Sequence, residues 1–582
     1  MAGSPTPVPS SNAGAESAAP PQSQAAESDI AALQRQRSIE QAIAEGHDAD
    51  IPSDIGYVLD EQGEEKRRKS IAEQRRHSLA RKRSHASEQH IDPEKDHAAN
   101  TSAASISKDE EAGGTTSEDE ANIVWWEEND PENPYNWPTW LKVLNCVFIS
   151  ALTLVTPLGS SIFAPGVAQL MQEFGSDSLE LASFVVSVYV LGFAAGPLVI
   201  APLSEIYGRL WVYHLCNMAF LAFLVGCALA PSLNALIAFR FLSGVFGSCP
   251  LTNGGGTIAD MIVPEKRASA MAAFSIGPLL GPIIGPVAGG FLAEAAGWRW
   301  VFWLLVIVAG VLAIVMLIFA RETYAPVLLQ RRVDKLKKET GNDMLRSKLD
   351  SGLSAKDYFK RSIVRPLRML VFSPTCIIFA FYIAIIYGYL YLMFTSISDV
   401  FHRSYGFSTS TVGLVFLGLG LGSMSGLFFF GYSSDQKAKK TKAEGLPMKP
   451  EDRLELMPYA AILLPAGFFI YGWTAEKHVH WIVPILSHIP GGFSMVVTFM
   501  SLNMALVDTF TIYAASALAA NTVVRSIFGA VLPLFGLRMY HALGLGWGNS
   551  LLAFISLLMI PIAFGILKYG ELLRVKYPIK NL

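Results

Sequence analysis

Residues 277–286 read Gly-Pro-Leu-Leu-Gly-Pro-Ile-Ile-Gly-Pro, inside an apolar stretch near residues 270–293. The glycines recur every four residues, so in a helix they share one face, on which small residues allow close approach of a neighbouring membrane helix. Each proline removes a backbone donor and favours bending. We expect a gating helix that bends at the interface of two halves, and plain helix packing is the alternative. The residues of this pattern are Gly277, Pro278, Gly281, Pro282, Gly285, Pro286 and Gly289.

The rest of the chain has the composition of a membrane protein. It has 582 residues, of which 51% are hydrophobic and 16% charged. A spanning helix needs about 20 mostly apolar residues, because lipid offers the backbone no hydrogen-bond partner. The sequence therefore predicts an all-α polytopic membrane protein with twelve transmembrane helices. The spans are expected near 141–163, 182–203, 211–230, 235–257, 270–293, 299–320, 374–396, 411–431, 457–474, 481–506, 513–536 and 545–568.

The spans fall into two groups of six, which predicts two pseudo-symmetric halves with a substrate site between them near the bilayer midplane. The halves are expected at 125–320 and 373–582, joined by a basic loop over 321–372. Residues 1–124 are rich in Ser, Ala, Glu and Pro and predict a disordered tail. Lys and Arg gather in loops on one side of the spans, so the positive-inside rule places the loop and both termini in the cytoplasm.

A weak internal repeat supports the two halves. Residues 201–209 follow the second span and contain Ser204-Glu205, and residues 431–437 follow the eighth span and contain Ser434-Asp435. An acid thus follows a small residue at the equivalent turn of each half.

These motifs resemble those of the major facilitator superfamily, and the chain is similar to the fungal twelve-span drug:proton antiporters. In the loop motif after the second span, Leu203, Gly208 and Arg209 match, whereas Ala201, Glu205 and Ile206 depart from the common pattern. The stretches 240–256, 277–286, 322–324 and 450–454 resemble further motifs of the family and its fungal branch. The resemblance covers roughly residues 133–568 and implies proton-coupled export. It implies that Glu205, Arg209 and Arg240 take part in proton coupling or gating.

Two arginines stand inside spans, where an unpaired charge is costly. Arg240 in the fourth span is expected to face the bundle interior, with snorkelling to the nearby interface as the alternative. Arg525 in the eleventh span is expected to face the cavity, with an interhelical bond as the alternative. The first span has no acidic residue, so the proton carrier is left open. Weaker candidates near span ends are Asp260, Glu294 and Asp508.

The seventh span carries a stripe of aromatic residues. Tyr387, Tyr391 and Phe394 follow i, i+4, i+7 spacing and share one face. Facing the cavity, they could hold flat apolar or cationic solutes, and ordinary packing is the alternative. The polar residues Asn253, Asn503 and Asn521 could orient a substrate or bond between helices.

The sequence therefore predicts a proton-coupled exporter of small organic molecules in the cell membrane, with protons, substrate and membrane lipids as its partners and no nucleic acid. No Gly-Lys dipeptide occurs, so the phosphate-binding loop of an ATP-driven pump is absent. No metal-ligand set or catalytic constellation is recognised, so neither an enzyme nor a cofactor is expected. The alternatives are a nutrient or polyamine transporter, or a non-transporting membrane sensor. Basic clusters at 66–69, 75–76 and 81–83 could attract anionic lipids, and a solvated run of charges is the alternative.

Overall fold

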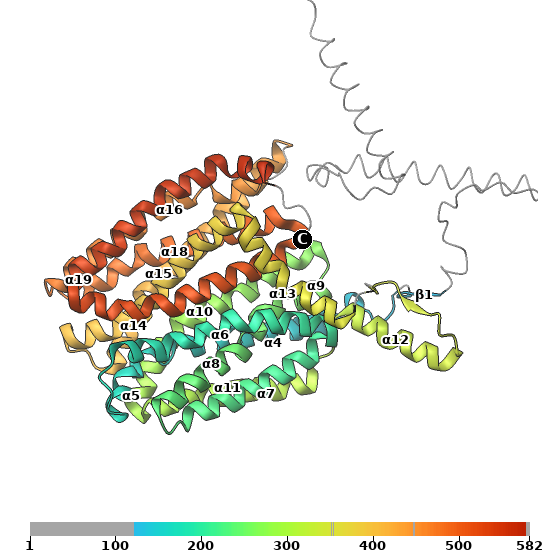
Figure 1. The fold of residues 1–582 in the computed structure, drawn as a ribbon, viewed down its shortest axis with the longest axis horizontal. Helices are drawn as coiled ribbons and strands as arrows, with labels where there is room; N and C mark the ends of the chain where they lie inside the picture. Colours follow the sequence, from blue (N-terminus) through green and yellow to red (C-terminus); the bar gives the residue numbers. More distant parts are fainter. Residues whose placement is uncertain (1–121, 128, 351, 353, 446–448, 578–582) are drawn as a thin grey trace, which may run out of the picture. The chain divides into compact units, whose positions relative to one another are not determined.

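The computed structural model describes residues 122–127, 129–350, 352, 354–445 and 449–577 (Figure 1). The predictions for the tail before residue 122 lie outside the described residues. Long helices fill most of the described part. The spans of the first half are α4 (Thr139–Ser161), α6 (Leu179–Tyr207), α7 (Arg209–Ala228), α8 (Leu233–Gly247) with α9 (Cys249–Met261), α10 (Pro264–Ala296) and α11 (Trp298–Phe319).

The second half repeats this plan, and Figure 1 shows its orange and red helices gathered on one side of the green helices of the first half. Its spans are α14 (Pro374–Tyr405), α15 (Thr409–Ala443), α16 (Met457–Ala461) with α17 (Leu463–Glu476), α18 (Ile482–Phe510) and α19 (Ala514–Lys576). The short element η2 (Pro134–Asn136) precedes the first span. Other short elements join the spans: η3 (Ala164–Gly166), α5 (Val167–Glu173), η4 (Pro450–Leu454) and η5 (Thr511–Tyr513).

The helix α19 contains two spans. Its backbone leaves helical geometry at Gly544, where φ is 76°. The Glu476 carboxylate accepts hydrogen bonds from the backbone N–H groups of Leu545, at 2.7 Å, and Gly546, at 3.3 Å. A positive φ suits glycine, and an acid suits the start of a helix. Eleven described helices are long and apolar enough to cross a membrane, and the division of α19 makes twelve spans, which confirms the predicted fold class.

Burial separates the lipid-facing helices from the interior ones. In α11, Ile314, Leu317 and Ile318 are exposed, as expected for a helix that contacts lipid. In α14, by contrast, Tyr389 and Phe394 are almost fully buried. The halves meet where α10 packs against α15 and where α6 packs against α19. The site described below lies between the halves, among helices of both.

The segment predicted as a polar loop over 321–372 contains regular structure. It forms α12 (Ala325–Thr340), β2 (Arg346–Ser347) and α13 (Ala355–Phe372). The strand β1 (Ile123–Val124) pairs with β2 in a parallel two-stranded sheet. Ordered structure thus begins inside the segment 1–124 that the composition assigns to the tail, because the central segment supplies a partner strand that composition does not reveal.

Ion pairs add to this pairing. Arg332 on α12 binds the carboxylates of Asp130 and, at 2.9 Å, Glu127. Lys348 lies 4.9 Å from the ring centre of Trp125. We call these interactions and the β1–β2 pairing the linker contact. The end of the bundle that carries α12 and α13 is called the linker end below, and the opposite end is called the α5 end.

Candidate functional site

A charge cluster lies at the linker end of the first half. Arg209 begins α7, and its Nε donates to Asp260 Oδ2 on α9 at 3.3 Å. Its Nη1 donates to Ser204 Oγ at 2.7 Å, and that hydroxyl donates to Asn253 Oδ1 at 3.0 Å. Glu205 adds to the negative field at Arg209. The cluster ties α6, α7 and α9 together and contains the acid that sequence placed only among the weaker candidates.

The position of α7 within this cluster depends on Glu322. Its carboxylate accepts hydrogen bonds from the backbone N–H groups of Arg209 and Leu210, at 2.9 and 3.1 Å. It also accepts bonds from Thr323 and Tyr324, each at 3.0 Å. The residue before α7 is Gly208, where a Cβ atom would lie 2.3 Å from Glu322 Oε2. A buried acid at the start of α7 therefore holds the turn that presents Arg209.

The second half repeats the cluster. Arg453 Nε donates to Asp508 Oδ2 at 2.9 Å, and its Nη1 donates to Ser434 Oγ at 2.7 Å. Each half thus joins a serine after one span, an arginine and an aspartate at the end of another span. The sequence repeat at Ser204 and Ser434 points to this relationship, but the arginines lie at different distances from the serines along the chain, which hides the pairing.

Arg240 on α8 is 1% exposed and therefore does not snorkel. Its guanidinium donates to four backbone carbonyls, of Val185 and Val186 on α6 and of Gly159 and Ser160 on α4, at 2.6 to 3.5 Å. Three aromatic rings surround it at 5.3 to 5.7 Å from their centres: Phe163, Tyr189 and Phe302. Among the described residues no carboxylate forms an ion pair with Arg240. The prediction that it faces the interior is confirmed, and its partners are carbonyls and rings.

The glycines of α10 pack against α4 within the first half. Cβ atoms added at Gly277, Gly281 and Gly285 would approach atoms of α4 to 2.9, 2.8 and 2.4 Å, and one at Gly289 would approach the carbonyl of Ile162, the residue after α4, to 1.8 Å. Such distances require the helices to move apart, so close approach, as predicted, depends on these glycines. The proline face points elsewhere: Pro278 and Pro282 line a cavity, and the Pro286 carbonyl lies against Gly413 of α15. One face of α10 therefore holds its own half while another faces the second half.

A cavity of about 260 Å³ lies between the halves. Its lining comes from α4, α6, α9 and α10 of the first half and from α14, α15, α18 and α19 of the second. The residues of the aromatic stripe, Tyr387, Tyr391 and Phe394, share one face, as the spacing predicts, and line this cavity together with Arg525. Most of the other lining residues are apolar, which is typical of a small-molecule site.

The three asparagines are not among the side chains that line this cavity. Asn253 belongs to the Arg209 cluster, as described above. Asn521 Nδ2 donates to Asn503 Oδ1 at 3.0 Å, which joins α18 to α19. Interhelical bonding, the alternative to a substrate-orienting role, therefore describes all three in this conformation.

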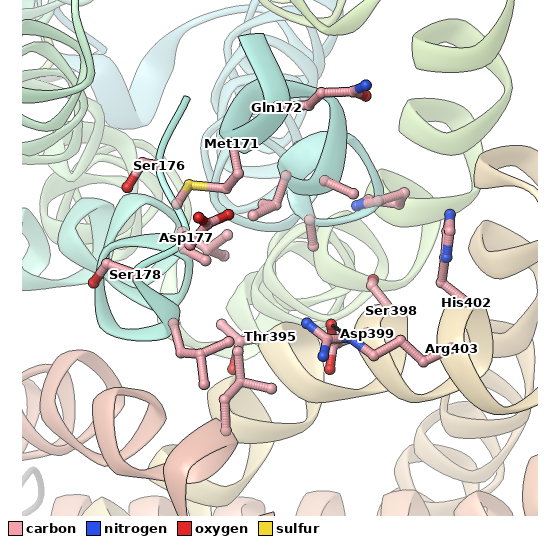
Figure 2. A pocket seen from close by; sticks show the side chains of 18 of the residues that line it. Met171, Gln172, Ser176, Asp177, Ser178, Thr395, Ser398, Asp399, His402 and Arg403 are labelled. Carbon is pink, nitrogen blue, oxygen red and sulfur yellow. Dashed lines mark hydrogen bonds and ion pairs between the residues drawn. The ribbon is translucent and has the colours of Figure 1, made fainter. Parts of the chain in front are cut away.

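A larger hollow of about 800 Å³ lies at the α5 end. Figure 2 shows Gln172, Ser176 and Asp177 of the first half on one side of it and Ser398 and Arg403 of α14 on the other. The Arg403 guanidinium donates to Asp399 at 2.7 Å. Because many polar and charged side chains line this hollow, it suits a hydrated passage better than a close-fitting site for an apolar molecule. We call it the vestibule.

Polar contacts join the halves beside the vestibule and between the vestibule and the middle of the bundle. Glu180 on α6 pairs with Arg538 on α19, and Glu294 accepts from the backbone N–H of Ser410 at 2.7 Å. Nearer the middle, Ser187 Oγ donates to the Ala530 carbonyl at 2.9 Å. The hydroxyls of Ser160 and Tyr391 are also 2.9 Å apart. These contacts hold the two halves together toward the α5 end in this conformation.

Comparison with known proteins identifies a consistent set of relatives. Residues 149–533 match the sequence profile of the Major Facilitator Superfamily. The chain is 54% identical to the MFS-type transporter tndD of Aspergillus flavipes, over 78% of this chain and 86% of that protein. It is 47% identical to the efflux pump radE of Floropilus chiversii, over 84% and 93% of the two chains. The fold is similar to that of the xylose transporter XylE from E. coli in a partially occluded inward-open conformation, with a TM-score of 0.53 at 14% identity over 72% of this chain and 97% of that one.

Proposed function

The chain belongs to the major facilitator superfamily, and on this premise we propose that it exports small organic molecules in exchange for protons. It is a multi-pass membrane transporter and does not belong to an enzyme family. The proposed action is alternating access, in which the halves at 125–320 and 373–582 rock about a central site.

The observation that carries this proposal is the cavity between the halves. Both halves contribute to its lining, so relative motion of the halves would change access to it. Pro278 and Pro282 of α10 face the same space, and α10 also contacts α15 of the other half. Movement of α10 is therefore proposed to couple the cavity to the interface, which is the gating role expected for this helix.

Export is supported by two independent features. One relative, at 47% identity, carries the name efflux pump. The repeated Gly-Pro pattern of α10 resembles the motif of antiporters in the family. The cavity also favours an organic molecule with apolar surface, because aromatic and aliphatic side chains make up most of its lining.

Proton coupling is proposed to involve Arg240 and the Arg209 cluster. Arg240 binds α4 and α6 together through their carbonyls, so a change in its environment would alter both helices. Arg209 is a permanent cation, whereas Asp260 can take up a proton. Protonation of Asp260 would remove its negative charge and weaken the ion pair between them. Glu205 lies beside this pair and is proposed to tune it.

The proposed location is the cell membrane, with the linker end and both termini in the cytoplasm. The support is the positive-inside rule: α12 and α13 carry many basic residues, including Arg331, Lys335, Lys360 and Arg361.

A polyamine transporter is disfavoured by the charge of the cavity. The residues that line it include one cation, Arg525, and no carboxylate. A polycationic substrate would meet a charge of its own sign in a site of low dielectric constant.

The proposal is tested in yeast cells that express the chain and are loaded with neutral, acidic and basic aromatic compounds. An exporter lowers the retention of at least one compound, and a protonophore restores that retention. An importer raises retention instead. A non-transporting sensor leaves retention of the entire panel unchanged, which would contradict the proposal.

A further inference from the structure

Arg525 is a cation in the cavity between the halves, and the described residues supply no hydrogen-bond acceptor for it. Among the described residues it forms no hydrogen bond and no ion pair, and its Nε is buried without an acceptor. Its guanidinium carbon lies 5.1 Å from the ring centre of Tyr387 and 5.3 Å from that of Phe499. A guanidinium held among rings at the depth of a membrane carries a large desolvation cost unless an anion or dipole compensates it.

Three other arginines in or at the ends of the spans are compensated by the protein. Arg240 has four carbonyls, Arg209 has Asp260, and Arg453 has Asp508. Arg525 differs because its surroundings are aromatic and aliphatic, with hydroxyl groups such as those of Ser423 and Tyr387 in the same lining. The acceptor that Arg525 lacks must therefore come from water or from a bound molecule.

We propose that the cavity takes a flat, largely apolar organic acid whose anionic group pairs with the guanidinium of Arg525. The assignment rests on the proposed export function, since it names the class of molecule exported. A planar guanidinium binds a carboxylate or a similar delocalised anion through two parallel hydrogen bonds. The low dielectric constant of the cavity strengthens that pair, so the cavity becomes more selective for acids.

The aromatic side chains complete the site. Tyr387, Tyr391 and Phe394 line one wall from α14, and Phe499 on α18 lies beside Arg525. The faces of these rings suit the flat apolar part of a ligand. The stripe alone is compatible with cationic solutes, but Arg525 already lies near the Tyr387 ring and would repel a second cation. The sign of the preferred ligand therefore follows from Arg525.

The test measures equilibrium binding of three probes of one shape to the purified chain in lipid nanodiscs. The probes are 2-naphthoate, the neutral 2-naphthamide and the cationic 2-naphthylmethylammonium. We expect the wild type to bind the acid at least about tenfold more tightly than the amide, a difference of about 1.4 kcal/mol, and to bind the cation least. The wild-type measurement alone can overturn the proposal. It does so if the three affinities are equal, if the amide or the cation binds more tightly, or if the acid does not bind.

Substitutions then locate the anion site. Arg525→Gln should lower affinity for 2-naphthoate about tenfold or more and leave affinity for 2-naphthamide unchanged, whereas Arg525→Lys should fall between. Lys568→Gln removes an exposed positive charge from the same helix, outside the cavity lining, and should change neither affinity. A loss of acid binding in the Lys568 variant equal to that in Arg525→Gln would assign the effect to general charge and contradict the proposal.

This experiment is independent of transport. If the wild type prefers the acid but yeast cells show no export of any compound, the export function fails and the anion site stands. If export is found but the exported molecules are neutral or cationic and the nanodiscs show no preference for the acid, the anion site fails and export stands.

Discussion

The hydroxyl of Ser160 on α4 lies 2.9 Å from the hydroxyl of Tyr391 on α14, and the hydrogen bond between them is one of those that join the two halves. The carbonyl of the same serine accepts a hydrogen bond from Arg240 at 3.2 Å. A buried arginine, a contact between the halves and the aromatic stripe of the cavity thus meet at one residue. This arrangement gives a physical route by which the first half can respond to occupation of the cavity.

Loss of the Tyr391 hydroxyl should shift the balance between conformations. Tyr391→Phe keeps the ring and removes the bond to Ser160. Hydrogen bonds between membrane helices contribute roughly 0.6 to 1.7 kcal/mol, so the equilibrium should shift about 3- to 20-fold away from closure of the α5 end. The shift is measured as labelling of a cysteine introduced in the vestibule. Tyr389→Phe is the matched control, because its hydroxyl bonds to Leu552 within the second half; an equal effect of both substitutions would refute the role of the Ser160 bond.

Arg240→Ala should reduce proton-driven efflux more than substrate binding. The substitution removes the hydrogen bonds that the guanidinium donates to carbonyls of α4 and α6, about 1.5 to 3 kcal/mol each for a charged donor, and frees α4 from α6. Arg240→Lys keeps the charge but loses the planar fork, so we expect partial activity. Binding and efflux are measured separately at equal protein abundance. Parallel loss of binding and efflux would instead make Arg240 a structural support of the site.

Gly281→Val should stop transport while the protein remains inserted. The first added atom would lie 2.8 Å from the Leu154 carbonyl and from the Leu158 nitrogen, so α10 and α4 must separate. Gly565 on α19 has no atom within 4 Å of an added Cβ, and Gly565→Val is therefore the control. Efflux by the two variants is compared at matched surface abundance. Normal efflux in the Gly281 variant would show that close packing of α10 on α4 is not needed for transport.

Asp130→Asn should loosen the linker contact. Burial opposes ionisation of Asp130, but hydrogen bonds from the Glu132 backbone and from Arg332 outweigh it and hold the pKa of Asp130 below its usual value. A lowered pKa means that the ionised form stabilises the contact above the ordinary Asp pKa of about 3.9. That stabilisation is lost as the pH falls through the lower, folded-state pKa.

The linker contact is measured as tryptic cleavage at Arg346 and Lys348 in the purified chain. At pH 7 we expect cleavage several-fold faster in Asp130→Asn than in wild type. The Glu127 side chain is 80% exposed, compared with 6% for Asp130, so Glu127→Gln should have little effect. Equal cleavage rates in all three proteins would show that Asp130 does not hold the linker segment.

The features predicted correctly from sequence depend on local periodicity. The spacing of Tyr387, Tyr391 and Phe394 determines a shared face, and the cost of a buried charge directs Arg240 and Arg525 inward. Contacts between distant segments were not predictable in the same way. The partner of Arg209 lies 51 residues away at Asp260, and β1 pairs with a strand more than 200 residues further along the chain. A polar residue in a span can face a cavity or another helix, and only the three-dimensional arrangement shows that Asn253, Asn503 and Asn521 bond between helices.

Proton-driven transport by the purified chain tests the central claim most directly. The chain is reconstituted into liposomes with an acidic lumen, and uptake is followed for the compound that expressing yeast cells extrude most strongly. An antiporter should accumulate this compound in the lumen as protons leave, and a protonophore should abolish the accumulation. Uptake that is the same with and without the pH gradient, or the same in liposomes without protein, would contradict proton-coupled export.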